Sequence, residues 1–222
     1  MLNNTRITGV LFDLDGTLLD TAPDMVASLL PICSRLNLPE PEYAAAREHV
    51  SRGAAGLLRM AFPGFNEEQI AGLVPEYLEI YASRLAVDTV LFDGMEPLLQ
   101  DFDANDILWG VVTNKPAFLT DPLLQSMNLY DRCACVVSGD TLPQRKPAPE
   151  PLLHGLSQAG LSAENSLYIG DAERDIEAGR AAGMYTVAAA FGYIPPEENA
   201  SEWQADHIIH TPAEIVEIMA RY

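Results

Sequence analysis

Apolar residues cluster in short unbroken runs along the chain, and longer segments with helical spacing separate these runs. A run that does not alternate with polar residues is typical of a strand buried on both faces of a sheet. Because helical segments alternate with the runs, the sequence predicts an α/β fold with a parallel sheet. The runs are Val10–Phe12, Ile107–Thr113, Cys133–Ser138, Ser166–Asp171 and Thr186–Phe191, with a weaker one at His207–Ile209.

One long segment interrupts this alternation. Between about Ala22 and Ala86 the apolar residues recur at helical spacing, and four helices are expected there. A connection between a strand and the next helix is typically about 2–6 residues long, so this segment is too long for one. We expect a helical domain of residues 21–87 inserted into a core of residues 1–20 and 88–222; extra helices packed on the sheet are the alternative. The expected helices span Asp24–Leu38, Ala44–Val50, Ala54–Phe62 and Glu67–Ala86.

Polar side chains follow four of the predicted strands. Ligands of a parallel sheet bind beyond the carboxyl ends of its strands, so these side chains are candidates for a site. Carboxylates favour Mg²⁺ over zinc, and a hydroxyl and a lysine beside such a cation indicate a phosphoryl group. The residues are, in strand order, Asp13, Asp15, Gly16 and Thr17; Thr113, Asn114 and Lys115; Arg145 and Lys146; and Asp171, Glu173 and Asp175.

Composition narrows the class of partner. The formal net charge is -19, which argues against nucleic acid and against an anionic membrane surface. A small anionic substrate still fits if local cations reverse the field at one cleft. The cysteines form no C-x-x-C, no secretory signal is recognisable, and no apolar run approaches a membrane span. We therefore expect a cytoplasmic monomer or weak dimer that acts on a small phosphorylated metabolite.

Four motifs of this chain resemble those of the haloacid dehalogenase-like superfamily of phosphohydrolases, and the match covers the whole chain. The helical segment after the first strand is similar to the helical cap of that family. The resemblance implies a Rossmann-like core with the active site at the strand ends. The motifs are Asp13-Leu14-Asp15-Gly16-Thr17, Thr113 in "VVTNK", Lys146 in "RKPAPEP", and Gly170-Asp171 followed by Asp175.

The resemblance also implies a mechanism. Asp13 would attack phosphorus and form an aspartyl-phosphate, while Asp15 would carry the proton to and from the reacting oxygens. The cofactor Mg²⁺ would be bound by Asp13, Asp171 and the backbone carbonyl of Asp15. Asp175 would orient Lys146 or a metal-bound water. The expected phosphate-binding residues are Thr113, Asn114 and Lys146.

Three neighbouring polar residues receive no catalytic role from the sequence. Lys115 is interpreted as a solvated loop lysine. Asp20 and Asp24, in "LDTAPD", are interpreted as helix caps, because Asp and Thr before Ala-Pro are typical of a helix start.

The pattern also separates subfamilies. The dehalogenases of the family lack an acid at the position of Asp15, so ester hydrolysis is favoured here. Phosphonate hydrolases need a cap lysine, and the segment Ala22–Ala86 contains none. Sugar phosphomutases keep the same acid pair and stay as an alternative. In the cap, Arg52 of "VSRGAAG" is the expected contact for the distal group of the substrate, with a helix-surface arginine as the other interpretation.

Outside the core motifs the chain resembles the phosphoglycolate phosphatase branch. The segments "LWGVVTNKP" and "FGYIPPEENASEWQADHIIHTP" are similar to bacterial N-acetylmuramic acid 6-phosphate phosphatases of cell-wall recycling. Both substrates carry a phosphomonoester and a carboxylate, so Arg52 does not choose between them. A signalling receiver is disfavoured by the helical insert, and a non-catalytic binding protein by the presence of every nominated group. The expected function is phosphomonoester hydrolysis of the phosphoglycolate phosphatase type.

Overall fold

A parallel sheet forms the centre of the molecule in the computed structural model, which describes residues 6–222. Within these residues the sheet has six strands in the order β5-β4-β1-β6-β7-β8, and each neighbouring pair runs parallel. The α/β prediction with a parallel sheet is therefore confirmed. The strands are β1 (Gly9–Phe12), β4 (Leu108–Val112), β5 (Val136–Val137), β6 (Ser166–Gly170), β7 (Tyr185–Ala189) and β8 (His207–Ile209).

Helices cover both faces of this sheet. Successive side chains of a strand point to opposite faces, so Val10 and Phe12 pack on one side and Leu11 packs on the other. The first side carries α6 (Met95–Ala104), α7 (Ala117–Ser126) and α10 (Glu214–Met219), and the second carries α8 (Glu150–Ala159) and α9 (Glu173–Ala181). This double covering explains why the strand sequences are continuously apolar.

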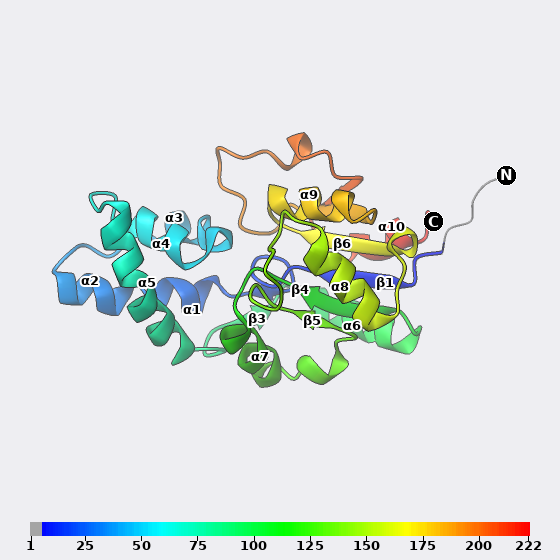
Figure 1. Ribbon diagram of the computed structural model, residues 1–222, viewed down its shortest axis with the longest axis horizontal. Coiled ribbons are helices and arrows are strands. Elements are labelled where there is room, and N and C mark those ends of the chain that lie inside the picture. The colour runs from blue at the N-terminus through cyan, green and yellow to red at the C-terminus, as the bar shows by residue number, and fades with distance from the viewer. Residues whose placement is uncertain (1–5) are drawn as a thin grey trace.

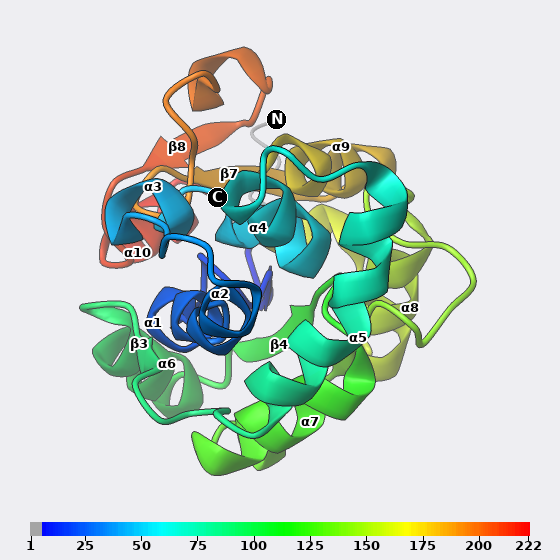
Figure 2. The same cartoon turned by 90° about the vertical axis from the view of Figure 1, so that its left-hand side faces the viewer.

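The segment between β1 and α6 folds into helices that bury a hydrophobic cluster of their own. Figures 1 and 2 show these helices at the end of the molecule opposite α10, over the carboxyl ends of the strands. Leu119 of α7 and Tyr193 join the same cluster, so the insert packs onto the core. The domain division at residues 20/21 and 87/88 stays a prediction. The helices are α1 (Ala22–Ala27), α2 (Leu30–Leu36), α3 (Tyr43–Arg47), α4 (Gly53–Ala61) and α5 (Glu67–Ala82), with a 3-10 turn at Val50–Arg52.

The first expected helix, Asp24–Leu38, is in fact two helices. The structure ends α1 at Ala27 and begins α2 at Leu30, with Pro31 in the first turn of α2. Proline has no N–H to continue a preceding helix, and its fixed φ suits a helix start. The apolar periodicity alone did not reveal this break.

The two chain segments that join the insert to the core lie side by side. Strand β2 (Leu19–Asp20) pairs antiparallel with β3 (Val90–Leu91) at this point. The buried carboxylate of Asp24 accepts backbone N–H bonds from residues 87, 88 and 89 at 3.0–3.1 Å and the Thr89 hydroxyl bond at 2.8 Å. The helix-cap interpretation of Asp24 was therefore wrong, because its carboxylate ties the returning segment to α1.

Asp20 does not cap α1 either. Its carboxylate accepts hydrogen bonds from Arg47 at 2.6 Å and from the Tyr193 hydroxyl at 2.7 Å. Both partners are distant in sequence, which is why local helix-start signals gave the wrong role. Asp20 thus links the insert, through Arg47, to the loop that follows β7.

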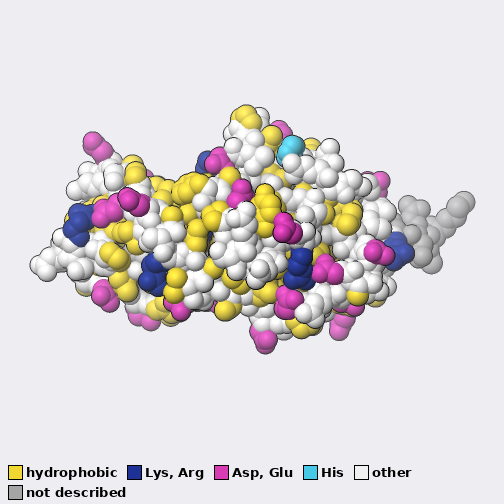
Figure 3. Space-filling view, turned by 90° about the horizontal axis from the view of Figure 1, so that it is seen from below, with side chains coloured by type: hydrophobic (Ala, Val, Ile, Leu, Met, Phe, Trp, Pro, Cys, Tyr) yellow, Lys and Arg dark blue, Asp and Glu magenta, His cyan; other side chains and the backbone are white. Residues whose placement is uncertain are grey.

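The surface is acidic, as the net charge of -19 requires. Figure 3 shows Asp and Glu side chains spread over one face, with the few basic side chains lying beside acidic ones. Among residues 6–222, every helix is too short or too polar to cross a membrane. Short 3-10 turns at Tyr130–Arg132, Ala163–Asn165 and Ala200–Glu202 complete the described elements.

Asp24→Ala is expected to lower the free energy of unfolding by about 3 kcal/mol or more, because several buried donors lose their acceptor together. Urea unfolding followed by circular dichroism measures this. The matched control is Asp88→Ala, whose side chain is 61% exposed and whose backbone bond is kept; it is expected to change stability by less than about 0.5 kcal/mol. Equal effects of the two substitutions would contradict the role of the Asp24 carboxylate.

Candidate active site

The register of the sheet brings three of the predicted motifs to one edge. Phe12 is level with Val111 of β4 and with Ile169 of β6. The residues that follow these strands are therefore neighbours, although they lie far apart in the sequence. Asp13 and Asp171 both emerge here, and each is almost completely buried.

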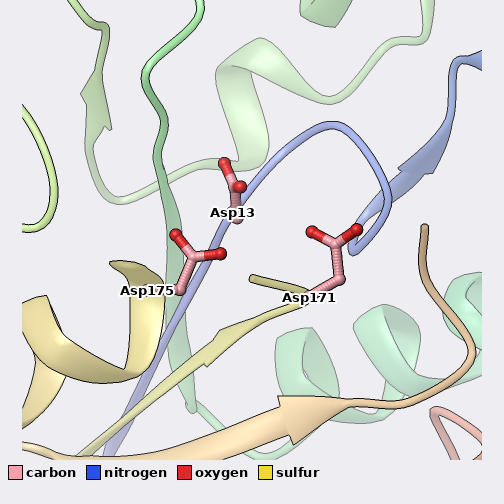
Figure 4. A group of neighbouring side chains, drawn as sticks. All are labelled: Asp13, Asp171 and Asp175. Carbon is pink, nitrogen blue, oxygen red and sulfur yellow. The ribbon is translucent and has the colours of Figure 1, made fainter. Parts of the chain in front are cut away.

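Three carboxylates converge at this edge. Asp13, Asp171 and Asp175 each present an oxygen, and these oxygens lie within 4.8 Å of one another. Figure 4 shows the three side chains turned toward a common centre, from the loop after β1, the end of β6 and the start of α9. Like charges this close repel strongly without a cation between them.

Lys146 neutralises part of this charge. Its ammonium nitrogen lies 2.9 Å from Asp13 Oδ1 and 2.8 Å from Asp175 Oδ1. The contact between Lys146 and Asp175 Oδ1 is an ion pair, but its angles do not meet the geometry of a hydrogen bond. Lys146 also donates to the Tyr168 hydroxyl at 2.8 Å and to the Val112 carbonyl at 3.0 Å. Tyr168 therefore helps to hold the lysine, a role that its position inside an apolar strand did not indicate.

The pKa directions follow from these contacts. Burial opposes ionisation of Asp13, but the charges of Lys146 and Arg174 hold its pKa below the ordinary value. Burial outweighs the Lys146 ammonium at Asp175, so the pKa of this carboxyl is raised. Burial, together with the charges of Asp13 and Asp175, raises the pKa of Asp171 to about 7. Asp171 is thus the carboxylate that lacks a countercharge.

This arrangement fits a divalent cation. Three buried carboxylate oxygens within reach of one another are the donor set that Mg²⁺ and similar hard cations take. Lys146 and Arg174 bring two positive charges to three acids, and burial together with the charges of Asp13 and Asp175 still raises the pKa of Asp171. The group is therefore consistent with a metal site.

Glycines allow the close approach of the surrounding backbone. Gly16 has φ +87°, a left-handed conformation that favours glycine, and a Cβ there would collide with the Asp171 carboxylate. A Cβ at Gly170 would likewise collide with the Asp175 side chain. The turn after the first strand and the end of β6 therefore require glycine at these positions.

Asp15 lies beside this group and faces different partners. Its Oδ1 accepts a hydrogen bond from the Thr21 hydroxyl at 2.7 Å and one from Lys115 Nζ at 2.8 Å. The interpretation of Lys115 as a solvated loop lysine was wrong, because its side chain is only 4% exposed. Neighbouring residues in the sequence did not reveal this burial, since the cover comes from the helical insert.

The second motif supplies two residues with different surroundings. Thr113 is buried at the cavity wall, and its hydroxyl accepts the Lys115 backbone N–H at 3.2 Å. Asn114 exchanges two hydrogen bonds with the Lys146 backbone, at 3.0 and 3.1 Å. Asn114 thus fixes the loop that carries Lys146.

A cavity of about 420 Å³ lies between these residues and the insert. The core contributes Asp13, Asp15 and Thr113, and the insert contributes a wall of mostly apolar and aromatic residues. Arg52 lines the cavity but is half-exposed, and it pairs with Glu197 and Glu198 of the loop after β7 at 2.8 and 2.9 Å. The lining also includes Val50, Ser51, Ala54, Ala55, Tyr81, Arg145 and Arg174.

Two cavity residues escaped the sequence analysis. The Ser51 hydroxyl of the insert donates to Asp171 Oδ2 at 2.6 Å. Arg174 donates to the Ser51 carbonyl at 2.9 Å and lies 3.9 Å from Asp13 Oδ2. The sequence offered one indication of the role of Arg174, because this residue directly precedes Asp175 of the fourth motif. It offered none for Ser51.

Comparison with known proteins agrees with this geometry. The model of the family described as haloacid dehalogenase-like hydrolase matches residues 10–189. A phosphoglycolate phosphatase of Xanthomonas campestris pv. campestris is 43% identical over 94% of each chain. An N-acetylmuramic acid 6-phosphate phosphatase of Pseudomonas aeruginosa is 38% identical over 99% of this chain and 98% of its own.

A solved structure extends the agreement to the fold. A protein from Haemophilus somnus described as a predicted phosphoglycolate phosphatase superposes with a TM-score of 0.84 at 25% identity, over 97% of this chain and 99% of its own. The family match covers most of the chain, and the relatives match it over nearly their full length. The chain therefore belongs to the haloacid dehalogenase-like hydrolases and is a phosphatase of that family.

Proposed function

We propose that this protein is a Mg²⁺-dependent phosphomonoesterase that works through an aspartyl-phosphate on Asp13. The observation that carries the proposal is the buried group of Asp13, Asp171 and Asp175 with Lys146 between two of its members. The motif order and the family support the same chemistry. The substrate class is a small carboxylated or sugar phosphate of the phosphoglycolate phosphatase type.

In the first step a carboxylate oxygen of Asp13 attacks phosphorus, and the bond from phosphorus to the ester oxygen breaks. Asp15 gives its proton to the departing oxygen, so the product leaves as an alcohol. Lys146 and the Thr113 hydroxyl bind the phosphoryl oxygens, and Asn114 keeps the Lys146 loop beside them.

In the second step Asp15 takes a proton from water, and the water oxygen attacks phosphorus. The bond between phosphorus and Asp13 then breaks, which restores the carboxylate and releases inorganic phosphate. Asp175 holds Lys146 in place throughout by its 2.8 Å ion pair. The insert covers the cavity and limits the access of bulk water.

The cation would be held by Asp13, Asp171 and the backbone carbonyl of Asp15. When bound, Mg²⁺ supplies positive charge that lets an anionic carboxylate approach a dianionic phosphate. Asp175 stays with Lys146 because the pair is buried, and removing one partner of such a pair costs about 3–5 kcal/mol.

The cavity also bears on the substrate. About 420 Å³ falls within the range of roughly 300–1,000 Å³ found for small-molecule sites. This volume and the apolar wall of Val50, Ala54 and Ala55 favour a second candidate, N-acetylmuramic acid 6-phosphate, over a leaving group as small as glycolate. Ranking 2-phosphoglycolate, N-acetylmuramic acid 6-phosphate and several sugar phosphates by kcat/KM decides between them. Release of inorganic phosphate, and not of an isomeric sugar phosphate, distinguishes the hydrolase from a mutase.

Asp13→Asn is expected to reduce turnover of p-nitrophenyl phosphate by at least about 10³-fold, because an amide does not replace the attacking carboxylate. Steady-state release of p-nitrophenol measures the rate, and circular dichroism verifies that the variant is folded. Substantial activity in the folded variant would exclude Asp13 as the nucleophile.

Chelation is expected to abolish activity, and added Mg²⁺ is expected to restore it. Mg²⁺ should also raise the melting temperature of the wild-type protein, since a ligand of the folded state stabilises it. In Asp171→Asn this Mg²⁺-induced rise should disappear, while the metal-free variant melts no lower than the metal-free wild type, because one repelling charge is gone. Full activity in chelator, or an unchanged rise in Asp171→Asn, would contradict the metal assignment.

Arg52→Ala tests the proposed contact with the distal carboxylate of the substrate. The variant should raise KM for carboxylated phosphates about tenfold or more and change KM for p-nitrophenyl phosphate much less. A substrate carboxylate would replace Glu197 and Glu198 as the partners of Arg52, so the double variant Glu197→Gln with Glu198→Gln serves as the control for loss of that pairing alone. Equal effects of Arg52→Ala on both substrate types would remove Arg52 from the binding site.

A further inference from the structure

Lysine is rare in this chain, and both of its lysine side chains are buried near the candidate active site. The chain contains two lysines, Lys115 and Lys146, while its other basic side chains are arginines. Lys146 is fully buried beside the carboxylate group, and Lys115 is 4% exposed at the cavity wall. Burying an ammonium group is costly unless it is paired and hydrogen-bonded, so the partners of Lys115 call for an explanation.

The first partner of Lys115 is Asp15. Lys115 Nζ donates to Asp15 Oδ1 at 2.8 Å, and the Thr21 hydroxyl donates to the same oxygen at 2.7 Å. Two donors from different segments fix the rotation of a carboxylate that one donor would leave free to turn. Both bonds end on Oδ1, which leaves Oδ2 for the proton that moves between Asp15 and the substrate.

The second partner belongs to the insert. Lys115 Nζ donates to the Tyr81 hydroxyl at 2.7 Å and lies 4.5 Å from the centre of the Tyr81 ring, within cation–π range. Tyr81 is on α5 and is buried, with Tyr77 stacked one turn before it at 6.4 Å. The lysine that holds Asp15 is therefore itself held by a helix of the insert.

We propose that Lys115 is a positioning residue for Asp15, and that Tyr81 makes this positioning depend on the docked insert. This assignment rests on the proposed function, because it concerns the proton-transfer step of that mechanism. The side chain of Lys115 bonds to the Asp15 carboxylate and the Tyr81 hydroxyl, so its effect on the reaction passes through Asp15. Two side-chain hydrogen bonds, from Lys115 to Tyr81 and from Lys115 to Asp15, thus join α5, the loop after β4 and the first motif.

A lysine suits this position better than an arginine. Its compact ammonium directs protons to a carboxylate oxygen and a hydroxyl from a single point, whereas a guanidinium fork is planar and wider. The Tyr81 hydroxyl accepts from the lysine and so adds no negative charge to the cavity, since burial keeps the pKa of Tyr81 well above its ordinary value.

The test uses aryl phosphates of similar size whose leaving groups differ in basicity, namely p-nitrophenyl, 4-chlorophenyl and phenyl phosphate. The quantity kcat/KM reports the steps up to departure of the leaving group. A basic phenolate needs the proton of Asp15 to leave, whereas p-nitrophenolate leaves without it. Misplacing Asp15 should therefore slow the basic esters selectively.

Lys115→Met and Tyr81→Phe are the variants, with Tyr77→Phe as the matched control on the same helix. In Lys115→Met the ratio of kcat/KM for phenyl to p-nitrophenyl phosphate should fall at least about tenfold from the wild-type ratio, and Tyr81→Phe should shift it in the same direction. Tyr77→Phe loses a different hydrogen bond, to the Met25 carbonyl, and should leave the ratio unchanged.

A parallel loss on all three esters in Lys115→Met and Tyr81→Phe would overturn the proposal, because a purely structural role predicts it. Should Lys115→Met fail to fold, Tyr81→Phe decides by itself, since it removes one hydroxyl and keeps the packed ring. A wild-type protein without Mg²⁺-dependent turnover would overturn the proposed function and this assignment together. An active wild-type enzyme with unchanged ratios would overturn the positioning assignment alone.

Discussion

The repulsion among three buried carboxylates at the edge of the sheet is the constraint on which the rest of the site depends. Oxygens of Asp13, Asp171 and Asp175 lie within 4.8 Å of one another, and the three side chains are almost completely buried. Lys146 pairs with Asp13 and Asp175, and Asp171, which lacks such a partner, has a pKa raised to about 7 by burial and by the charges of the other two acids. The cluster is consistent with a metal site, and the proposed Mg²⁺ would offset the negative charge that Lys146 leaves.

The helical insert takes part in this site directly. Ser51 donates to Asp171, Arg174 of the core donates back to the Ser51 carbonyl, and Tyr81 accepts from Lys115. Each contact joins an insert residue to a residue at the strand ends. The position of the insert is therefore linked by hydrogen bonds to Asp171 and, through Lys115, to Asp15, and a cavity lies between the insert and the strand ends.

Two acids, Asp20 and Asp24, make further contacts between distant segments where the chain enters the insert. Asp24 gathers the backbone of the returning segment, and Asp20 reaches Arg47 and Tyr193. The local sequence around both acids is typical of helix caps. In the structure, however, their carboxylates accept hydrogen bonds from donors in distant segments instead. Their contacts keep the two connecting segments together, which fixes where the insert stands relative to the strand ends.

The sequence by itself determined the class of fold, the four motifs and the edge of the sheet where they meet. This was possible because each motif directly follows an apolar run in the sequence, and a parallel sheet brings the carboxyl ends of its strands to one edge. Tertiary structure alone decided the partners of Lys115, Asp20 and Asp24, and the presence of Tyr168, Ser51 and Arg174 at the site. Those contacts join segments far apart in the chain, and burial by a distant helix leaves no local pattern of residues that predicts it.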